Sequence, residues 1–266
     1  MCASPALAHV PPSQAPPKAI PKTQENTREA DETMVAADDE EVAADMKIDE
    51  FSSYFERVEK PRLLLTTSKA PTSVTFDFLR ELALIFPNTE YYKRGTYEMK
   101  KICKFAANRG FTNVMVVHEE KKKLTGLWLV HLPNGPTAHF KLTSIKQGHE
   151  ISGHGKAVDR NPEVNLAQFS TRLGTTIGRM LASLFPPNPA FRARQVATFH
   201  NQRDFIFFRR HRYIFESAEK ARLQELGPQF TLKLRSLQYG TFDTKHGEVE
   251  FMAKKENVDS RRRFFL

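Results

Sequence analysis

The sequence predicts an α/β fold in which one structural unit occurs twice. Two stretches, GPTAHFKLTSIKQG at 135–148 and GPQFTLKLRSLQYG at 227–240, align without a gap and share Gly-Pro, Lys-Leu, Ser and a closing Gly. A second pair follows the same order, since FLRELALIFP at 78–87 matches IGRMLASLFP at 177–186 in its Arg, Leu-Ala and Phe-Pro. Offsets of 92 and 99 residues between the copies are expected of a duplicated unit whose loops differ in length.

Length and composition are those of a soluble chain with a core of its own. The chain has 266 residues, of which 40% are hydrophobic, so it needs no disulfide or metal to fold. Its two cysteines cannot form a disulfide framework or a zinc cluster, which favours a reducing, intracellular compartment. No apolar run approaches about 20 residues and no secretory signal opens the chain, so we expect no membrane partner.

Charge divides the chain into an acidic tail and a basic body. Residues 1–50 hold four Lys/Arg against eleven Asp/Glu and are rich in Pro and Ala, whereas the remainder holds 36 basic against 20 acidic residues. We therefore expect the tail to be disordered or extended. The basic body predicts attraction to polyphosphate that weakens as salt rises. The alternative is that these charges only solvate the surface.

A short aromatic helix should begin the folded part. In IDEFSSYFERV, helical spacing brings Phe51, Tyr54 and Phe55 to one face. That face must dock on something, either the protein's own body or a partner. We take these three side chains as candidate partner-binding residues that help to anchor the acidic tail.

The first α/β half spans residues 51–150. Apolar runs predict strands, and helical spacing with Pro87 and Gly110 as stop signals predicts two helices. The resulting order is β-α-β-α-β-β-β, with strands at 62–67, near 91–92, at 114–117, at 126–132 and in the first repeat copy, and helices at 73–86 and 97–108.

The second half spans residues 151–266 and ends in the basic stretch SRRRFFL. The polar, Gly-rich segment 146–165 is expected to be a joining loop, and no clear first strand follows it. A helix is predicted at 170–185, where Gly174 and Gly178 permit another backbone to approach closely. Strands are predicted at 196–199, at 205–215, in the second repeat copy and at 248–252.

Motifs for catalysis are missing or wrongly spaced. GHGKA at 153–157 resembles a phosphate-binding loop, but Glu150 stands where the first glycine belongs and Ala157 where Ser or Thr should bind magnesium. His131, His139, His149 and His154 have no helical i, i+4 pair and no accompanying cysteine, so structural or surface roles outweigh a metal site. We expect no catalytic residue, no metal and no cofactor.

Features of nucleic-acid binding are stronger. HNQRDFIFFRRHRYIF at 200–215 mixes arginines with aromatic residues, as phosphate contacts and base stacking require, although Phe205, Phe207 and Phe208 are expected in the core. In the repeat copies, alternation points Leu232 and Leu234 inward and leaves the charged neighbours outside. The candidate RNA-binding residues are Lys141, Arg203, Arg209, Arg210, Arg212, Lys233, Arg235, Arg261 and Arg262.

These stretches also resemble the Brix-domain family of eukaryotic ribosome assembly proteins, from about Pro21 to Leu266. The resemblance implies a fold of two anticodon-binding-domain-like halves packed together, preceded by an extended tail. It is carried by DEFSSYF, KPRLLLTTS, HLPNGPTAHFKLTS, FSTRLGTTIGRMLASLFP, RQVATFHNQRDFIFFRRHRYIF, ELGPQFTLKLRSLQYG and DSRRRFFL.

Several functional expectations follow from this resemblance. It implies a non-enzymatic factor of the nucleus and nucleolus that binds pre-ribosomal RNA and works with a dedicated partner protein among other assembly factors. HLPNGPTAHFK followed by FHNQRDFIFFRRHRYIF points to the branch that serves the large (60S) subunit. Two alternatives remain: a small-subunit factor of the same family, and an adaptor that acts mainly through protein contacts.

Overall fold

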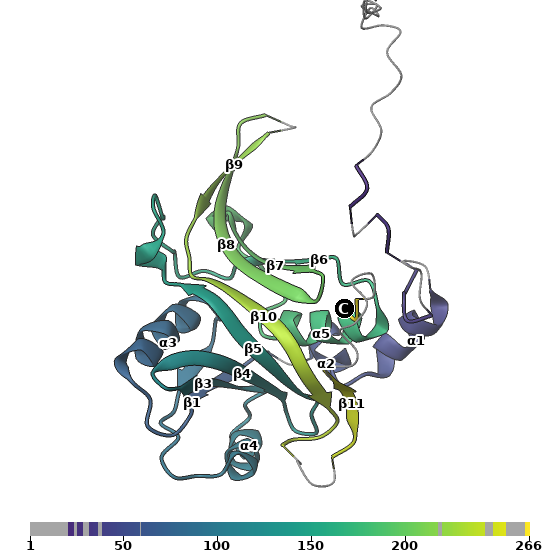
Figure 1. The fold of residues 1–266 in the computed structure, drawn as a ribbon, viewed down its shortest axis with the longest axis vertical. Coiled ribbons are helices and arrows are strands. Elements are labelled where there is room, and N and C mark those ends of the chain that lie inside the picture. The colour runs from purple at the N-terminus through teal and green to yellow at the C-terminus, as the bar shows by residue number, and fades with distance from the viewer. Residues whose placement is uncertain are drawn as a thin grey trace, which may run out of the picture.

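The strands of the described residues join one sheet, and the helices pack against its two faces (Figure 1). The computed structural model describes residues 21–23, 26–28, 32–36, 39–58, 60–217, 220–242, 247–253 and 264–266. Within these residues the sheet has eleven strands.

The first half has the element order that the sequence predicts. Helix α3 ends before Pro87, which has no N–H to continue it, and α4 ends before Gly110, whose φ is +73°. The elements are β1 (Leu63–Thr67), α3 (Ser73–Ile85), β2 (Thr89–Tyr91), α4 (Met99–Asn108), β3 (Asn113–Glu120), β4 (Lys123–His131) and β5 (Thr137–Lys146).

The second half repeats part of this plan and contains two strands, β6 and β9, that the sequence did not predict. We expected a loop up to residue 165, but Glu163–Ala167 forms β6, which pairs in parallel with β7 as β1 pairs with β3. Its residues are mixed in polarity, which hides the strand from pattern reading. The elements are η1 (Gly148–Glu150), β6 (Glu163–Ala167), α5 (Arg172–Ala182), η2 (Phe191–Ala193), β7 (Gln195–Gln202), β8 (Phe205–Phe215), β9 (Ala221–Glu225), β10 (Gln229–Gln238) and β11 (Val249–Met252).

The two repeat copies lie side by side at the centre of the sheet. The strand order is β2-β1-β3-β4-β5-β10-β8-β7-β6, with β9 beside β8 and β11 beside β10. Strands β5 and β10 are antiparallel, and Lys141 lies directly opposite Lys233, with Leu142 opposite Leu232. The duplicated units therefore meet through their equivalent strands, in a seam that makes one continuous sheet of both halves.

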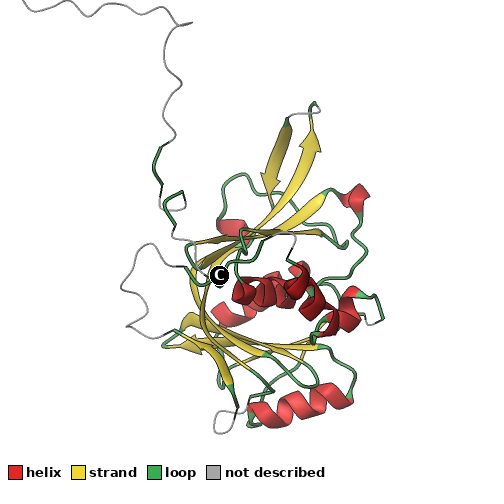
Figure 2. Cartoon of the chain, turned by 90° about the vertical axis from the view of Figure 1, so that its right-hand side faces the viewer, coloured by secondary structure: helices red, strands yellow, loops and turns green. Residues whose placement is uncertain are grey.

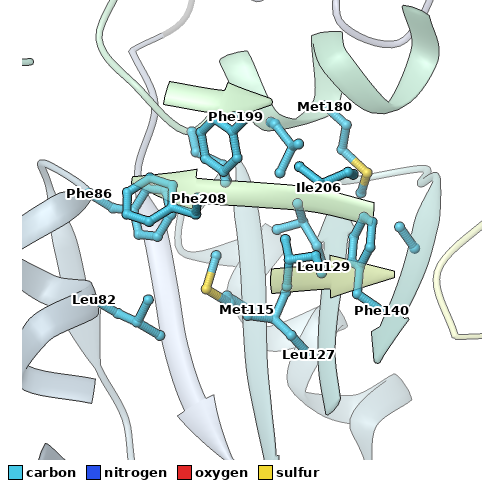
Figure 3. Packing of buried hydrophobic residues seen from close by; sticks show 14 of the residues in the cluster. Leu82, Phe86, Met115, Leu127, Leu129, Phe140, Met180, Phe199, Ile206 and Phe208 are labelled. Atoms are coloured by element: carbon cyan, nitrogen blue, oxygen red, sulfur yellow. The ribbon is translucent and has the colours of Figure 1, made fainter. Parts of the chain in front are cut away.

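The sheet curves around the helices that fill its inner face (Figure 2). Side chains from both halves form a single buried cluster there, which includes Leu82 and Phe86 from the first half and Phe199, Phe208 and Met180 from the second (Figure 3). The leucines Leu232 and Leu234 of the second repeat copy belong to this cluster, as expected. The two halves thus share one core.

Helix α4 is the exception, because it covers the outer face of the first half. Its Met99, Cys103 and Ala106 pack with Leu64, Val114, Val116 and Val130 in a second, smaller cluster. Burial raises the pKa of the Cys103 thiol to about 11. The outer face of β1, β3 and β4 is consequently a second core layer.

The expectation of a disordered or extended segment is wrong for the end of the acidic tail. Glu40–Ile48 forms helix α1, capped by the Asp39 side chain, and the helix α2 (Ser52–Phe55) follows. Arg172 of α5 pairs with Glu41 at 2.9 Å, and Arg179 binds Asp49 through two hydrogen bonds. The acidic residues are therefore held by basic residues of the body. Residues 1–20 lie outside the described residues.

Candidate nucleic-acid interface

The outer face of the second half has no helix over it among the described residues. Because strand side chains alternate, one set from β5, β10, β8 and β7 points away from the shared core. These residues, which we call the open face, are Lys141, Thr198, His200, Phe205, Phe207, Arg209, Thr231, Lys233 and Arg235. They mix four cations with two aromatic rings.

Two lysines mark the middle of the open face. Lys141 and Lys233 are direct cross-strand partners at the seam. Like charges in such a position repel, because their Cβ atoms are only about 5 Å apart. Lys233 turns over the ring of Phe205, with 4.4 Å between Nζ and the ring centroid, while Lys141 is exposed. The seam therefore presents a concentrated positive charge.

Arginines extend this charge along the neighbouring strands. Arg235 is exposed on β10, and Arg203 is exposed in the turn that joins β7 to β8. Arg209 of β8 is half-buried, and its Nε lies 3.7 Å from Glu225 Oε1, so this charge is partly balanced. Of the nine predicted RNA contacts, the structure brings Lys141, Lys233, Arg235 and Arg209 to one face, with Arg203 at its edge.

The prediction that the first three phenylalanines of β8 are in the core is correct for one of them. Phe205, Phe207 and Phe208 were all expected in the core, but only Phe208 is fully buried there. Phe205 is 38% exposed and Phe207 half-buried, both on the open face. The alternation of period two in FIFFR carries the signal that would have separated them. The open face thus offers rings as well as charges, as single-stranded nucleic acid requires.

A histidine and the single tryptophan form the border with the first half. The rings of His139 and Trp128 stack at 3.9 Å with an interplanar angle of 7°. Burial lowers the pKa of His139, and the nearby charges of His118 and Arg235 lower it further. His139 is therefore neutral at pH 7 and adds no charge to the open face.

Arg210 does not belong to the interface, which corrects the sequence-based assignment. Its side chain lies on the inner face of β8 and is 1% exposed. Its guanidinium group donates to the Leu84 carbonyl at 2.7 Å and to Gln195 Oε1 at 2.8 Å, and burial lowers its pKa. The expectation failed because neutral oxygens can hold the terminal nitrogens of a buried arginine, although the Nε of Arg210 has no hydrogen-bond partner. Arg210 joins the two halves instead.

The remaining predicted contacts lie elsewhere or cannot be placed. Arg212 lies near the C-terminal end of β8, and its guanidinium group donates to the Lys156 carbonyl at 3.0 Å. Arg261 and Arg262 lie outside the described residues. Arg212 thus remains a basic residue near a surface, but it is separate from the open face.

The aromatic residues of α2 bind the protein's own body. Phe51 is fully buried in the shared core, and the Tyr54 hydroxyl donates to the Phe185 carbonyl at 2.6 Å. Burial raises the pKa of Tyr54 to about 12. Phe55 is 43% exposed under the guanidinium group of Arg179. Phe51 and Tyr54 are therefore inaccessible to a partner protein, and their assignment as partner-binding residues is corrected.

Two structural findings concern other kinds of site. Among the described residues, no group of three His, Cys, Asp or Glu side chains is arranged to hold a metal ion. No helix in that part of the chain is long and apolar enough to cross a bilayer.

Known proteins resemble this chain in sequence over most of its length. The family model for the Brix domain matches residues 68–236. The chain is 53% identical to Ribosome production factor 1 from Pongo abelii over 255 residues, which are 95% of this chain and 73% of that protein. It is 49% identical to Probable ribosome production factor 1 from Drosophila melanogaster, over 92% of this chain and 64% of that protein.

A solved structure is similar as well. The probable ribosomal biogenesis protein from Aeropyrum pernix K1 superposes with a TM-score of 0.49 at 16% sequence identity, and the match covers 73% of this chain and 99% of that one.

Proposed function

Because this chain belongs to the Brix-domain family, we propose that it is a ribosome biogenesis factor whose open face binds pre-ribosomal RNA. The observation that carries the proposal is the seam, where Lys141 and Lys233 lie side by side and Arg235 extends the charge. Among the described residues, none of these three takes part in an ion pair. The Asp204 carboxylate lies near enough to Lys233 for their charges to interact, but Lys141 and Arg235 are exposed. Cations beside exposed rings are suited to phosphates and bases.

The role is one of binding. A factor of this kind recognises the RNA backbone and exposed bases and performs no chemical step, so we propose that the protein is not an enzyme. We further propose that it acts in the nucleolus on precursors of the large subunit, with a dedicated partner among other assembly factors. The relatives named Ribosome production factor 1 support the assembly role.

Reversing charges on the open face, with the same reversal on α4 as a control, tests the RNA site. The variant Lys233→Glu/Arg235→Glu should bind a pre-ribosomal RNA fragment at least about tenfold more weakly than the wild type and with a reduced salt dependence, because it removes phosphate contacts. The matched control is Lys101→Glu/Lys104→Glu, which makes the same charge change at exposed positions of α4. Fluorescence anisotropy at several salt concentrations measures both effects.

The outcome separates the proposal from its alternatives. Equal losses in both variants would mean that only overall charge matters and would remove the open face as the site. Unchanged RNA affinity in both, with normal association with pre-ribosomes, would favour an adaptor that works through protein contacts. Co-purification with precursors of the small subunit instead of the large one would assign the chain to the other branch.

A further inference from the structure

A second basic site lies beyond the open face, where the β8–β9 hairpin rises away from the body (Figure 1). A cavity of about 1030 Å³ opens there between η2, the loop before β6 and residues 212–214 of β8. We call it the arginine pocket, because Arg160, Arg192, Arg194 and Arg212 line it together with the aromatic residues Phe191 and Tyr213.

Two hydrogen bonds hold the walls of the arginine pocket in place. Tyr213 N donates to the Arg194 carbonyl at 2.9 Å, which ties η2 to β8. The Arg212 guanidinium group donates to the Lys156 carbonyl at 3.0 Å, which joins the loop before β6 to the same strand. Arg194 ends the η2 turn in the left-handed region, with φ +50° and ψ +42°. The four arginines therefore converge from three segments: β8 itself, and η2 and the loop before β6, which are both tied to it.

The charge of the pocket is not neutralised by carboxylates of the described residues. No ion pair there involves Arg160, Arg192, Arg194 or Arg212, whereas Arg62, Arg172 and Arg179 all pair with acidic side chains. Glu163 lies close by, but it accepts the hydrogen bond of the Tyr213 hydroxyl. A cluster of arginines in this state attracts an external anion.

The side chains of the pocket narrow the chemistry of that anion. Phe191 is 66% exposed between the arginines, although burying a phenylalanine is strongly favourable. Guanidinium groups match phosphate with paired hydrogen bonds and also stack on flat rings. A ligand that carries phosphates and a planar base uses both features, whereas an acidic peptide leaves the ring without a stacking partner.

The distance between the pocket and the open face also favours RNA as the ligand of the pocket. Tyr213 and Phe207 are on one strand, six residues and about 20 Å apart. An RNA strand bound on the open face is therefore within about 20 Å of the pocket, although Arg212, two residues from the inward-facing Arg210, points to the other face of β8.

We propose that the arginine pocket binds an unstacked nucleotide of single-stranded RNA, with its base on Phe191 and its flanking phosphates on Arg192, Arg194 and their neighbours. This inference rests on the proposed RNA-binding function and adds a second contact to it. Together, the open face and the arginine pocket give the protein two contact sites for one single-stranded RNA.

Substitutions that remove the ring or the charges test the pocket in the full-length chain. The probe is a decauridine RNA, followed by fluorescence anisotropy and by ultraviolet crosslinking with peptide mapping. Phe191→Ala should weaken binding about tenfold, as expected for one lost base stack, and Phe191→Trp should restore it. Arg192→Ala/Arg194→Ala should lower the salt dependence by about two counterions. In the wild type, uridine should crosslink to the peptide that contains Phe191.

Controls distinguish failure of the pocket from failure of the RNA-binding function. Lys101→Ala/Lys104→Ala on α4 removes the same charge elsewhere and should bind like the wild type. If Lys233→Glu/Arg235→Glu weakens binding but the pocket variants do not, the pocket proposal is wrong and the open face stands. If the wild type does not bind the RNA at all, both are wrong. Loss of polyglutamate binding in the pocket variants, with unchanged RNA affinity, would overturn the nucleotide assignment in favour of an acidic protein segment.

Discussion

The outer faces of the two halves are built from equivalent strands but have opposite character. The pairing of the ladders places Leu64, Val114 and Val116 of the first half at the positions of Asn165, Thr198 and His200 in the second. The first set is buried under α4 and the second faces outward. In the second half, the corresponding connection from α5 to β7 contains Pro186, Pro187 and Pro189 and only the short η2.

This difference shows how one copy of a duplicated unit can leave its outer face uncovered. One copy uses a helix to turn its outer face into core, which stabilises the fold. The other copy has no such helix among its described residues, and its outer face carries polar and aromatic side chains, some of which are exposed. The single sheet and shared inner core make this division possible, because the open half is already held by the core on its inner face.

The largest expected difference in the free energy of unfolding comes from placing a carboxylate at equivalent positions on the outer faces of the two halves. Val114→Asp should lower the free energy of unfolding by about 3–5 kcal/mol, because it buries an unpaired charge under α4. Thr198→Asp should change it by no more than about 0.5 kcal/mol, since its side chain faces outward. Urea denaturation measures both values. Similar losses for the two variants would mean that the open face is covered in solution.

Arg209 and Arg210 of β8, which point to opposite faces of the sheet, should give the next largest difference in stability. Arg210→Ala should lower the free energy of unfolding by about 3 kcal/mol, because it leaves the Leu84 carbonyl and Gln195 Oε1 without their donor. Arg209→Ala on the open face should alter stability by less than about 0.5 kcal/mol but weaken RNA binding. A reversed pattern, with Arg209 the more important for folding, would contradict the placement of the two faces.

The thiol of Cys103 reports whether α4 stays on the first half. Its pKa of about 11, against an ordinary value near 9, lowers the thiolate fraction about 100-fold at pH 8. In a Cys2→Ser background, Cys103 should react with a disulfide reagent at least that much more slowly than in urea. Fast reaction of the folded protein would show that the helix leaves the sheet readily.

The smallest effect concerns His139 at the border of the two faces. Its pKa is below the usual 6.5, so the unfolded chain takes up the proton first and stability declines as pH falls through about 6.5. His139→Gln should reduce this decline slightly. Because His139 stacks on the only tryptophan, fluorescence of Trp128 should titrate with a midpoint below 6.5. A midpoint above that value would place His139 in a different environment.

Much of the fold could be predicted because its signals are local. The repeat copies, the apolar runs and the prolines that end helices led to the correct element order in the first half. The strand β6 was missed because its sequence EVNLA has no clean alternation, and its partner β7 is remote in sequence. Helix α1 was missed because its charges are stabilised by Arg172 and Arg179, more than a hundred residues away.

The candidate site was predicted less completely, for a related reason. Alternation correctly assigned Lys141, Lys233 and Arg235 to the outer face. Composition alone failed for Arg210 and Phe205, where the charged side chain is inside and the apolar one outside. The arginine pocket could not be seen in the sequence, because its four arginines belong to segments that only the folded chain brings together.

The seam has a consequence for the direction of the RNA strand that we propose binds there. Lys141 and Lys233 are related by the approximate twofold axis of the duplication, so they look the same to an RNA backbone approaching with either polarity. The lysine doublet can attract RNA but cannot orient it. In the binding mode that we propose, the polarity of the RNA would come from residues that have no counterpart across the axis, namely Phe205, Arg209 and the arginine pocket, all of which lie on the side of the second half.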